Sequence, residues 1–229
     1  MREDNITINK TKIRDVVSEG MICSGKELGL NNDHDGIMIL DNKFKVGEEL
    51  NHALSLNESI FDFDITPNRG DCFSHLGIAR ELALIENKKI NIEKIVLQGN
   101  DFNTKDLIKV NVKDTVLCPR YTCRIIKNIK VEESPQWLKN RLGLIGQKSI
   151  NNIVDLANFI MFDLGQPLHT FDYDKLNGSE IEVRSAKKNE EILSLNNELN
   201  KLSVDDIVIA DSKGPIAIAG VIGSLDSQV

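Results

Sequence analysis

The most constraining feature of this sequence is an alternating apolar run that leads, through a turn, into a helical pattern. Residues 61–65 alternate between apolar and acidic side chains, which predicts a strand with its three apolar side chains on one buried face. Residues 66–70 (TPNRG) predict a turn, whose proline fixes φ and whose glycine is free to adopt positive φ. Asp71 is the expected N-cap of a helix that ends near residue 86. The expected buried stripe of this helix consists of Leu76, Ala79, Leu82 and Ala83.

The same periodicities predict further elements on either side. Residues 1–42 are typical of short strands and loops, including an alternation at 6–9 and an apolar run at 36–40 that should be buried. Two helices are expected after residue 133, the first opened by Ser134-Pro135 and the second capped by Ser149 and ended by Gly165. Strands are expected at 121–129, 181–184, 206–210 and 215–219, and a tight turn at 220–223.

These elements together predict an α+β fold spread over several domains. We expect a β-rich segment at 1–42, a small α/β module at 43–97, and a larger α/β domain at 107–229. The polar, aperiodic stretch 98–106 is the best candidate for a linker. Residues 1–42 hold too few strands to cover their own edges, so they are expected to be the end of a larger β domain.

Composition excludes some classes of protein. No apolar run approaches the roughly 20 residues needed to cross a bilayer, and the start of the chain is polar, so we expect a cytoplasmic protein with no membrane partner. The net charge of −7 argues against a general nucleic-acid binder. Residues 120–148 are an exception, because seven basic residues face two acidic ones there, a local net charge of +5. This segment is either a solvated face or an RNA-facing strip, and charge alone does not choose.

No metal site is expected from the sequence. The four cysteines, Cys23, Cys72, Cys118 and Cys123, form no CxxC pair. Residues 31–36 (NNDHDG) resemble the start of a calcium loop, but the twelfth position is Asn42 where a bidentate glutamate is needed. The four cysteines are therefore expected to be reduced, and the calcium-like stretch to be a polar turn.

His169 is the histidine in the most suggestive position. It follows the expected helix end in the sequence GQPLHTFD at 165–172, where a proline and a glycine can aim a side chain into a cleft. From spacing alone, a structural histidine and a functional one both remain open. No serine or cysteine lies in a recognisable nucleophile elbow, and Gly220 and Gly223 lack the residues of a phosphate-binding loop. Covalent hydrolysis and an ATP site within this chain therefore have no support.

Three motifs resemble one known family. Residues 63–72 (FDITPNRGDC) running into 77–81 (GIARE) resemble the strand–turn–helix of the bacterial phenylalanyl-tRNA synthetase β subunit. Residues 155–159 (DLANF) and 164–172 (LGQPLHTFD) resemble its editing domain. Residues 18–24 (SEGMICS) and 27–29 (ELG) resemble the end of its tRNA-binding OB-fold domain. The resemblance implies an internal part of that subunit, from the end of the OB fold to most of the editing domain.

The resemblance also implies a function, partners and cofactors. In the family, two β subunits pair with two catalytic α subunits, which attach phenylalanine to tRNA with ATP and magnesium. The β subunit contributes tRNA contacts and a second site that hydrolyses mischarged tyrosyl-tRNA. Such a site is needed because an apolar pocket rejects one added hydroxyl only about a hundredfold. This chain itself is expected to hold no cofactor and, in isolation, to be inactive.

Carried over by motif, Asn158 and His169 match the catalytic positions of the editing cleft, and Gly220 and Gly223 match another wall of it. His169 would act on water or ribose, and Asn158 would hold a carbonyl or hydroxyl. Two positions expected to bind substrate depart from the family, because Ala157 replaces a threonine and Lys148 replaces an arginine. The carboxylate that recognises tyrosine in the family would lie beyond Val229. The alternative implied by these departures is an editing-inactive scaffold that docks tRNA and supports the α subunit.

Overall fold

The computed structural model of the chain describes residues 7–30, 33–40, 42, 44–54, 56–92, 94–97, 99 and 102–229. The chain divides into two compact units, Met1–Glu58 and Ser59–Val229. Helices and a mixed sheet occur in the second unit, which confirms the predicted α+β class. The division into the three predicted domains stays a prediction. No helix in the described ranges is long and apolar enough to cross a membrane.

The N-terminal unit is poor in regular structure. β1 (Thr11–Ile13) and β2 (Val16–Ser18) form an antiparallel hairpin, whose turn residues Arg14 and Asp15 both adopt positive φ. α1 (Leu50–Ala53) is a single turn. The alternation expected at 6–9 forms no strand over its described residues 7–9.

The apolar run at 36–40 was expected to be buried, and this was wrong in part. Ile37 and Ile39 are exposed, while Met38 and Leu40 are half-buried. Successive side chains of an extended segment point to opposite sides, and only one side of this segment is covered. Within the calcium-like stretch, Asn31 and Asn32 lie outside the described residues.

The strand predicted at 61–65 is not formed. The segment is irregular, Phe61 is 74% exposed and Phe63 is exposed, and only Ile65 is half-buried. An isolated extended segment gains no ladder of hydrogen bonds, and no described strand of this unit pairs with it. The alternation therefore marks a segment able to form a strand, but the described part of the unit supplies no neighbour for it.

The helix after the turn begins three residues later than expected. A 3₁₀ turn, η1 (Gly70–Cys72), comes first, and α2 (His75–Ile85) is capped by Ser74, whose Oγ accepts a hydrogen bond from the Gly77 N–H at 3.0 Å. Gly70 does not adopt positive φ. Asp71 is not the cap, because its carboxylate pairs with the guanidinium of Arg69 at 2.8 Å. Of the expected stripe, Leu76, Ala79 and Ala83 are half-buried and Leu82 is exposed.

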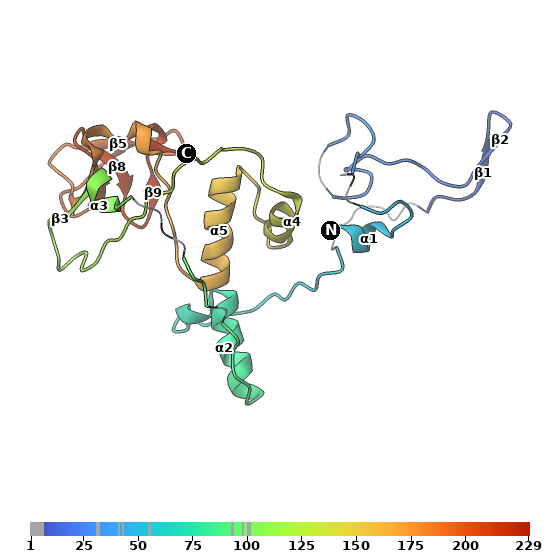
Figure 1. Cartoon of the computed structure of the whole chain (residues 1–229), viewed down its shortest axis with the longest axis horizontal. Coiled ribbons are helices and arrows are strands. Elements are labelled where there is room, and N and C mark those ends of the chain that lie inside the picture. The colour runs from blue at the N-terminus through green and yellow to red at the C-terminus, as the bar shows by residue number, and fades with distance from the viewer. Residues whose placement is uncertain are drawn as a thin grey trace. The chain divides into compact units, whose positions relative to one another are not determined.

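The sheet has five strands in the order β3-β4-β7-β8-β9. Its strands are β3 (Lys109–Val112), β4 (Glu180–Ser185), β7 (Ile207–Ala210), β8 (Pro215–Ile218) and β9 (Ile222–Gly223). β3 pairs with β4 in parallel, and the other neighbours are antiparallel. A separate hairpin, β5 (Glu191–Leu193) and β6 (Leu199–Lys201), lies against β8. Figure 1 shows the labelled strands of this region gathered into one body.

Strands were predicted correctly where β4, β7 and β8 lie, and the tight turn before β9 is also present. The strand predicted at 121–129 is wrong, because this segment is an unpaired loop and β3 supplies the edge strand instead. Tyr121 and Ile125 pack on the core from this loop, which explains the apolar pattern. Burial raises the pKa of Tyr121 to about 12, with smaller contributions from the neighbouring thiols of Cys123 and Cys118.

A pair of helices precedes the sheet strand β4. α4 (Gln136–Leu144) follows Pro135 and buries Leu138 and Leu142. α5 (Asn152–Leu164) packs on α4, and the rings of Trp137 and Phe159 meet edge to face at 5.6 Å. The remaining helical pieces are α3 (Thr104–Leu107), η2 (Tyr173–Lys175), η3 (Asn177–Ser179) and η4 (Leu225–Ser227).

The predicted end of α5 is confirmed and its predicted cap is wrong. Gly165 adopts the left-handed conformation with φ 76°, and its N–H bonds to the carbonyl of Met161. Asn151, not Ser149, caps the helix, accepting from the N–H groups of Ile153 and Val154. Figure 1 shows the C-terminal end of α5 meeting α2, where His75 Nδ1 lies 3.1 Å from the carbonyl oxygen of Phe162.

Candidate functional site

The structure places His169 directly against the glycine bend at the edge of the sheet. A Cβ atom built on Gly223 would lie 2.6 Å from Nε2 of His169 and closer still to Cε1. It would also lie 3.3 Å from Cδ1 of Leu195. The ring of Phe171 approaches the imidazole at 4.5 Å between centroids, with an interplanar angle of 60°. The imidazole of His169 therefore occupies the space that the missing side chain of Gly223 leaves open.

The imidazole is held by packing, since neither ring nitrogen is hydrogen-bonded to a protein group in the described ranges. Burial lowers the pKa of His169 below its usual value, because a charged ring loses hydration among these neighbours. The side chain still keeps an exposed surface. A neutral imidazole with two unsatisfied nitrogens can donate one hydrogen bond and accept another, which suits proton transfer.

Local geometry explains how His169 reaches this position. Gly165 stops α5, and residues 166–172 run on without regular structure. The Asp172 N–H then donates to the carbonyl of Ser227 at 3.2 Å, which fixes the far end of this segment. On the other side, Gly220 turns the chain between β8 and β9 with φ 72°. His169 is thus anchored at both ends of its loop beside β9.

The other predicted site residues are less closely joined to His169. Asn158 and Ala157 lie on α5 and are half-buried, and Lys148 is exposed in the loop between α4 and α5. No hydrogen bond links Asn158 to His169 in the residues that the structure describes. Gly220 shapes the β8–β9 turn without a side chain or backbone group within 4 Å of its Cβ position. The structure thus brings His169 and Gly223 together, and the roles of all six predicted site residues stay predictions.

Leu195 completes the surroundings of His169, and it was not predicted. It lies in the loop between β5 and β6, and its N–H donates to the carbonyl of Gly223 at 3.0 Å. Asn196-Asn197 between two short apolar runs is a hairpin signal that could have located this loop. Asn197 does adopt positive φ, as such a turn requires. Its proximity to His169 has no signal in the sequence.

Asp155 is a fully buried carboxylate that the sequence reasoning did not single out. It accepts hydrogen bonds from the hydroxyls of Ser134 and Ser149 and from the N–H of Ile150, the last at 2.8 Å. Burial alone would raise the pKa of Asp155, but these hydrogen bonds outweigh it and lower the pKa. All its partners are protein groups. Asp155 therefore has a structural role, in which it joins α5 to the loops that precede α4 and α5.

A group of possible metal ligands lies at the start of α2. The ligand atoms of Asp71, Cys72 and Glu81 lie within 4.8 Å of one another. Arg69 already pairs with both carboxylates, at 2.8 Å to Asp71 and 2.6 Å to Glu81. Hydrogen bonds from Arg69 lower the pKa of Asp71 to about 2. A guanidinium inside the group repels a metal cation, so this cluster is an ion-pair network that fixes the turn to the helix.

Part of the basic segment 120–148 is neutralised locally. Lys139 pairs with Glu133, and Lys130 pairs with Glu132 at 2.8 Å. Lys127 lies over the ring of Phe102 at 3.7 Å. Other basic residues of the segment, such as Lys148, remain exposed. These pairs use the two glutamates already counted in the net charge, so the strip keeps its net charge of +5.

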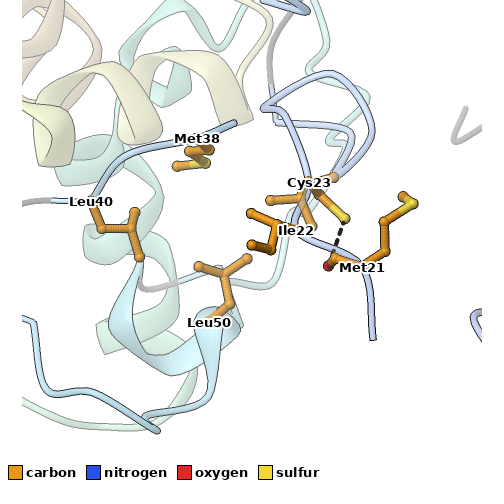
Figure 2. Close-up of a pocket in the computed structure, with 7 residues that line it drawn as sticks. Met21, Ile22, Cys23, Met38, Leu40 and Leu50 are labelled. Carbon is orange, nitrogen blue, oxygen red and sulfur yellow. Dashed lines mark hydrogen bonds between the residues drawn. The ribbon is translucent and has the colours of Figure 1, made fainter. Parts of the chain in front are cut away.

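A hollow of about 210 Å³ in the N-terminal unit holds none of the predicted site residues. Figure 2 shows its lining, which is formed by the apolar or sulfur-bearing side chains of Met21, Ile22, Cys23, Leu28, Met38, Leu40 and Leu50. The Cys23 thiol bonds to the carbonyl of Met21 at 3.5 Å. With no titratable group except one thiol, this hollow offers no acid–base chemistry.

Comparison with known proteins finds matches over nearly the whole chain. Residues 117–229 match the B3/4 domain family, and this range contains α4, α5, β4 to β9 and His169. The chain is 48% identical over 225 residues to the phenylalanine–tRNA ligase β subunit of Fusobacterium nucleatum, covering 98% of this chain and 28% of that protein. It is 42% identical over 223 residues to that of Syntrophus aciditrophicus, covering 97% of this chain and 28% of that protein.

Among solved structures, an N-terminal fragment of the phenylalanyl-tRNA synthetase β subunit from Pyrococcus horikoshii matches with a TM-score of 0.33 and 17% identity, covering 69% of this chain and 47% of that one.

The fold and the matched domain thus define a protein that contains a B3/4 domain. The chain belongs to the phenylalanyl-tRNA synthetase β-subunit family, as its motifs predicted. It spans 28% of the length of the curated relatives that it matches.

Proposed function

We propose that this chain contributes the site at which a phenylalanine–tRNA ligase hydrolyses mischarged tyrosyl-tRNA. The observation that carries the proposal is the placement of His169, whose neutral, unbonded imidazole lies against the backbone of Gly223. Hydrolysis of an ester by water needs a group that accepts a proton from the attacking water, and a neutral imidazole is suited to this at physiological pH.

In the proposed mechanism, the ester carbonyl lies beside β9 and a water molecule lies within hydrogen-bonding distance of His169. The imidazole accepts the proton of this water directly, or binds the free ribose hydroxyl that relays it. The bond between the carbonyl carbon and the esterified ribose oxygen then breaks, and the imidazolium returns the proton to that oxygen, which releases tyrosine and tRNA. Glycine at 223 lets the imidazole of His169 lie directly against the backbone, as a side chain there could not. No protein nucleophile is required, which agrees with the absence of a nucleophile elbow in the sequence.

The remaining predicted residues have supporting roles in this proposal. Asn158 holds a carbonyl or a ribose hydroxyl by its amide, and Gly220 shapes the turn before β9. Lys148 supplies a positive charge to the tRNA phosphates, without the two-pronged geometry of an arginine. Ala157 offers no hydroxyl, so any hydrogen bond made by a threonine at this place is lost here.

We further propose the wider setting that the resemblance implies. The chain works as part of a cytoplasmic ligase of two α and two β subunits, and tRNA is its nucleic-acid partner. The α subunit charges tRNA with phenylalanine and supplies the site for ATP and magnesium. The similarity to β subunits of phenylalanine–tRNA ligases supports this setting.

The test uses the complete ligase, with full-length β subunits and their α partners. The rate of tyrosine release from mischarged tyrosyl-tRNA is measured for the wild type, for His169→Ala and for His52→Ala. His52 is a matched control, because it is an exposed histidine of the N-terminal unit, paired with Glu48 at 2.7 Å. We expect His169→Ala to slow hydrolysis by about 10²- to 10⁴-fold, the usual contribution of a general base, and His52→Ala to change nothing. Equal rates in all three proteins would refute the role of His169.

A second candidate function is a scaffold without editing activity. The specific observation in its favour is a set of exposed apolar side chains at the end of α2 and in the segments before and after it, where Phe61, Leu84, Ile85, Ile95 and Val96 are each more than 70% exposed. Such surfaces mark contacts with other protein parts. The deacylation test separates the two candidates, since a scaffold would leave tyrosyl-tRNA intact while charging by the complete ligase proceeds.

A further inference from the structure

The loop between β5 and β6 and the side chain of His169 both lie next to Gly223. Cδ1 of Leu195 is 3.3 Å from the Cβ position of Gly223, and Nε2 of His169 is 2.6 Å from that same position. Both side chains therefore lie close to the position that a Cβ atom of residue 223 would occupy. Because no described protein group bonds to the imidazole nitrogens, side-chain packing of this kind is what limits the rotation of the ring.

The hairpin that carries Leu195 is firmly anchored to the sheet. Ile192 of β5 and Leu202, just after β6, are buried together with Val208 and Ala210 of β7. These contacts fix the body of the hairpin, so its loop is presented to β9 from a rigid support.

The loop itself is fixed by a buried hydroxyl. Ser194 has no exposed surface, and its Oγ accepts from Nδ2 of Asn200 at 2.6 Å and lies 2.6 Å from Oδ1 of Asn196. The Ser194 N–H donates to the carbonyl of Glu198 at 3.0 Å, which closes the loop. Buried polar groups that are fully satisfied in this way rigidify the chain around them.

Backbone pairing then ties the loop to the site. Ser194 forms an isolated antiparallel bridge with Ser224, and the Leu195 N–H donates to the carbonyl of Gly223 at 3.0 Å. The position of Leu195 is thus set relative to Gly223 itself, and not only relative to the far side of the sheet.

We propose that the β5–β6 hairpin is a positioning device for His169, in which Leu195 is the positioning residue and Ser194 holds the loop that presents it. Leu195 restricts the imidazole to the orientation in which its nitrogens face the substrate. Its Cδ1 borders the same Cβ position of Gly223 as the ring does, and it takes no part in proton transfer. The inference rests on the proposed editing role of His169, and it adds a residue that the motifs of the sequence do not contain.

The test measures the ring and the reaction separately in the complete ligase. Diethyl pyrocarbonate modifies neutral imidazoles, so the rate at which peptide mass spectrometry finds His169 modified reports the accessibility of its ring. Repeating the measurement between pH 5 and 8 gives the pH at which the ring titrates. The second readout is the rate of tyrosine release from tyrosyl-tRNA.

The variants are Leu195→Ala and Leu195→Val, with Leu193→Ala as the control. Leu193 is 37% exposed and Leu195 is 38% exposed, and Leu193 pairs across the hairpin with Leu199. The two leucines are therefore matched in residue type and burial. The valine variant lacks the Cδ1 atom but keeps a branched apolar side chain, so it tests the role of Cδ1 even if the alanine variant does not fold.

We expect both Leu195 variants to raise the modification rate of His169 severalfold and to move its titration up towards the usual histidine value. Tyrosine release should fall about ten- to a hundredfold in Leu195→Ala, as expected when a catalytic group is misplaced by about 1 Å. Leu193→Ala should leave both readouts within twofold of the wild type. Unchanged modification of His169 in the Leu195→Val protein would overturn the inference. A changed modification rate in a ligase that never hydrolyses tyrosyl-tRNA would keep the positioning role and refute the proposed function.

Discussion

Replacing Gly223 by alanine tests the central contact of the site most directly. The backbone at Gly223 is outside the left-handed region, so an alanine there carries no conformational strain. The new Cβ atom would instead lie 2.6 Å from Nε2 of His169. A real Cβ atom does not approach a heavy atom this closely, so the imidazole must move or rotate out of its place.

The expected loss of folding free energy in Gly223→Ala follows from overpacking. Inserting a methyl group into a filled space costs about 1–3 kcal/mol, and the lower end applies here because a half-exposed ring can shift. In a His169→Ala background the imidazole is gone and the nearest remaining atom is Cδ1 of Leu195 at 3.3 Å, the end of a flexible side chain, so Gly223→Ala should cost less than about 0.5 kcal/mol. The two substitutions should therefore show a coupling free energy of about 1 kcal/mol. By contrast, Gly220→Ala should cost about 1 kcal/mol from its φ of 72°, with no coupling to His169, because nothing lies near its Cβ position.

The assay is urea unfolding of the chain followed by the fluorescence of Trp137, its one tryptophan, which lies in the same unit as the site. Four proteins make the cycle: wild type, both single variants and the double variant. A second cycle serves as the control. It is built in the same way, with Gly220→Ala in place of Gly223→Ala. Additive free energies of unfolding in the Gly223 cycle, within about 0.5 kcal/mol, would show that His169 does not occupy this space.

Further outcomes follow from other contacts. Since burial lowers the pKa of His169, its neutral form persists below the usual value of about 6.5, so tyrosine release should lose activity only below that pH; a midpoint above 6.5 would contradict this. The hydrogen bonds that lower the pKa of Asp155 add stability that is fully present above the unfolded value near 3.9 and is lost as the pH falls through the folded value. Asp155→Asn, which turns an amide towards three donors, should cost about 1–3 kcal/mol at pH 7 in urea unfolding, and a neutral result would refute the network. A Cβ on Gly77 would overlap the carbonyl oxygen of Asp71, so Gly77→Ala should lower the melting temperature, whereas Gly143→Ala, with open space in α4, should stabilise by about 0.5–1 kcal/mol.

Local rules succeeded where a few neighbouring residues decide the conformation. Gly165 ends α5 in the left-handed conformation because only the backbone of one turn is involved. The strands β4, β7 and β8 each contain at least two isoleucine or valine residues and are bounded by turn signals, and they were located within a residue or two. Caps were less predictable. Ser149, Asn151 and Asp71 are all residue types that cap helices. Such a residue acts as a cap only where no other group already binds its side chain, and Arg69 binds that of Asp71.

The strand predictions that failed have a common physical reason. Residues 61–65 and 121–129 have apolar patterns that fit a strand, but a strand exists only where a neighbour supplies hydrogen bonds. In the second case the edge of the sheet is taken by β3, and the segment packs its apolar side chains on the core as a loop. An apolar pattern alone indicates that a segment has a face to bury. It does not indicate which strand, if any, pairs with that segment.

The sequence by itself determined the family and the α+β class, and it singled out His169 and the glycine bend as candidates, because these depend on short motifs and on local backbone geometry. Only the tertiary structure decided that the imidazole of His169 lies in the space left by Gly223, and that Leu195, from a hairpin 26 residues further along the chain, closes on the same point. The reason is that the order of strands in the sheet brings β9 beside the β5–β6 loop. That order is fixed by the packing of the whole core, and no short stretch of sequence encodes it.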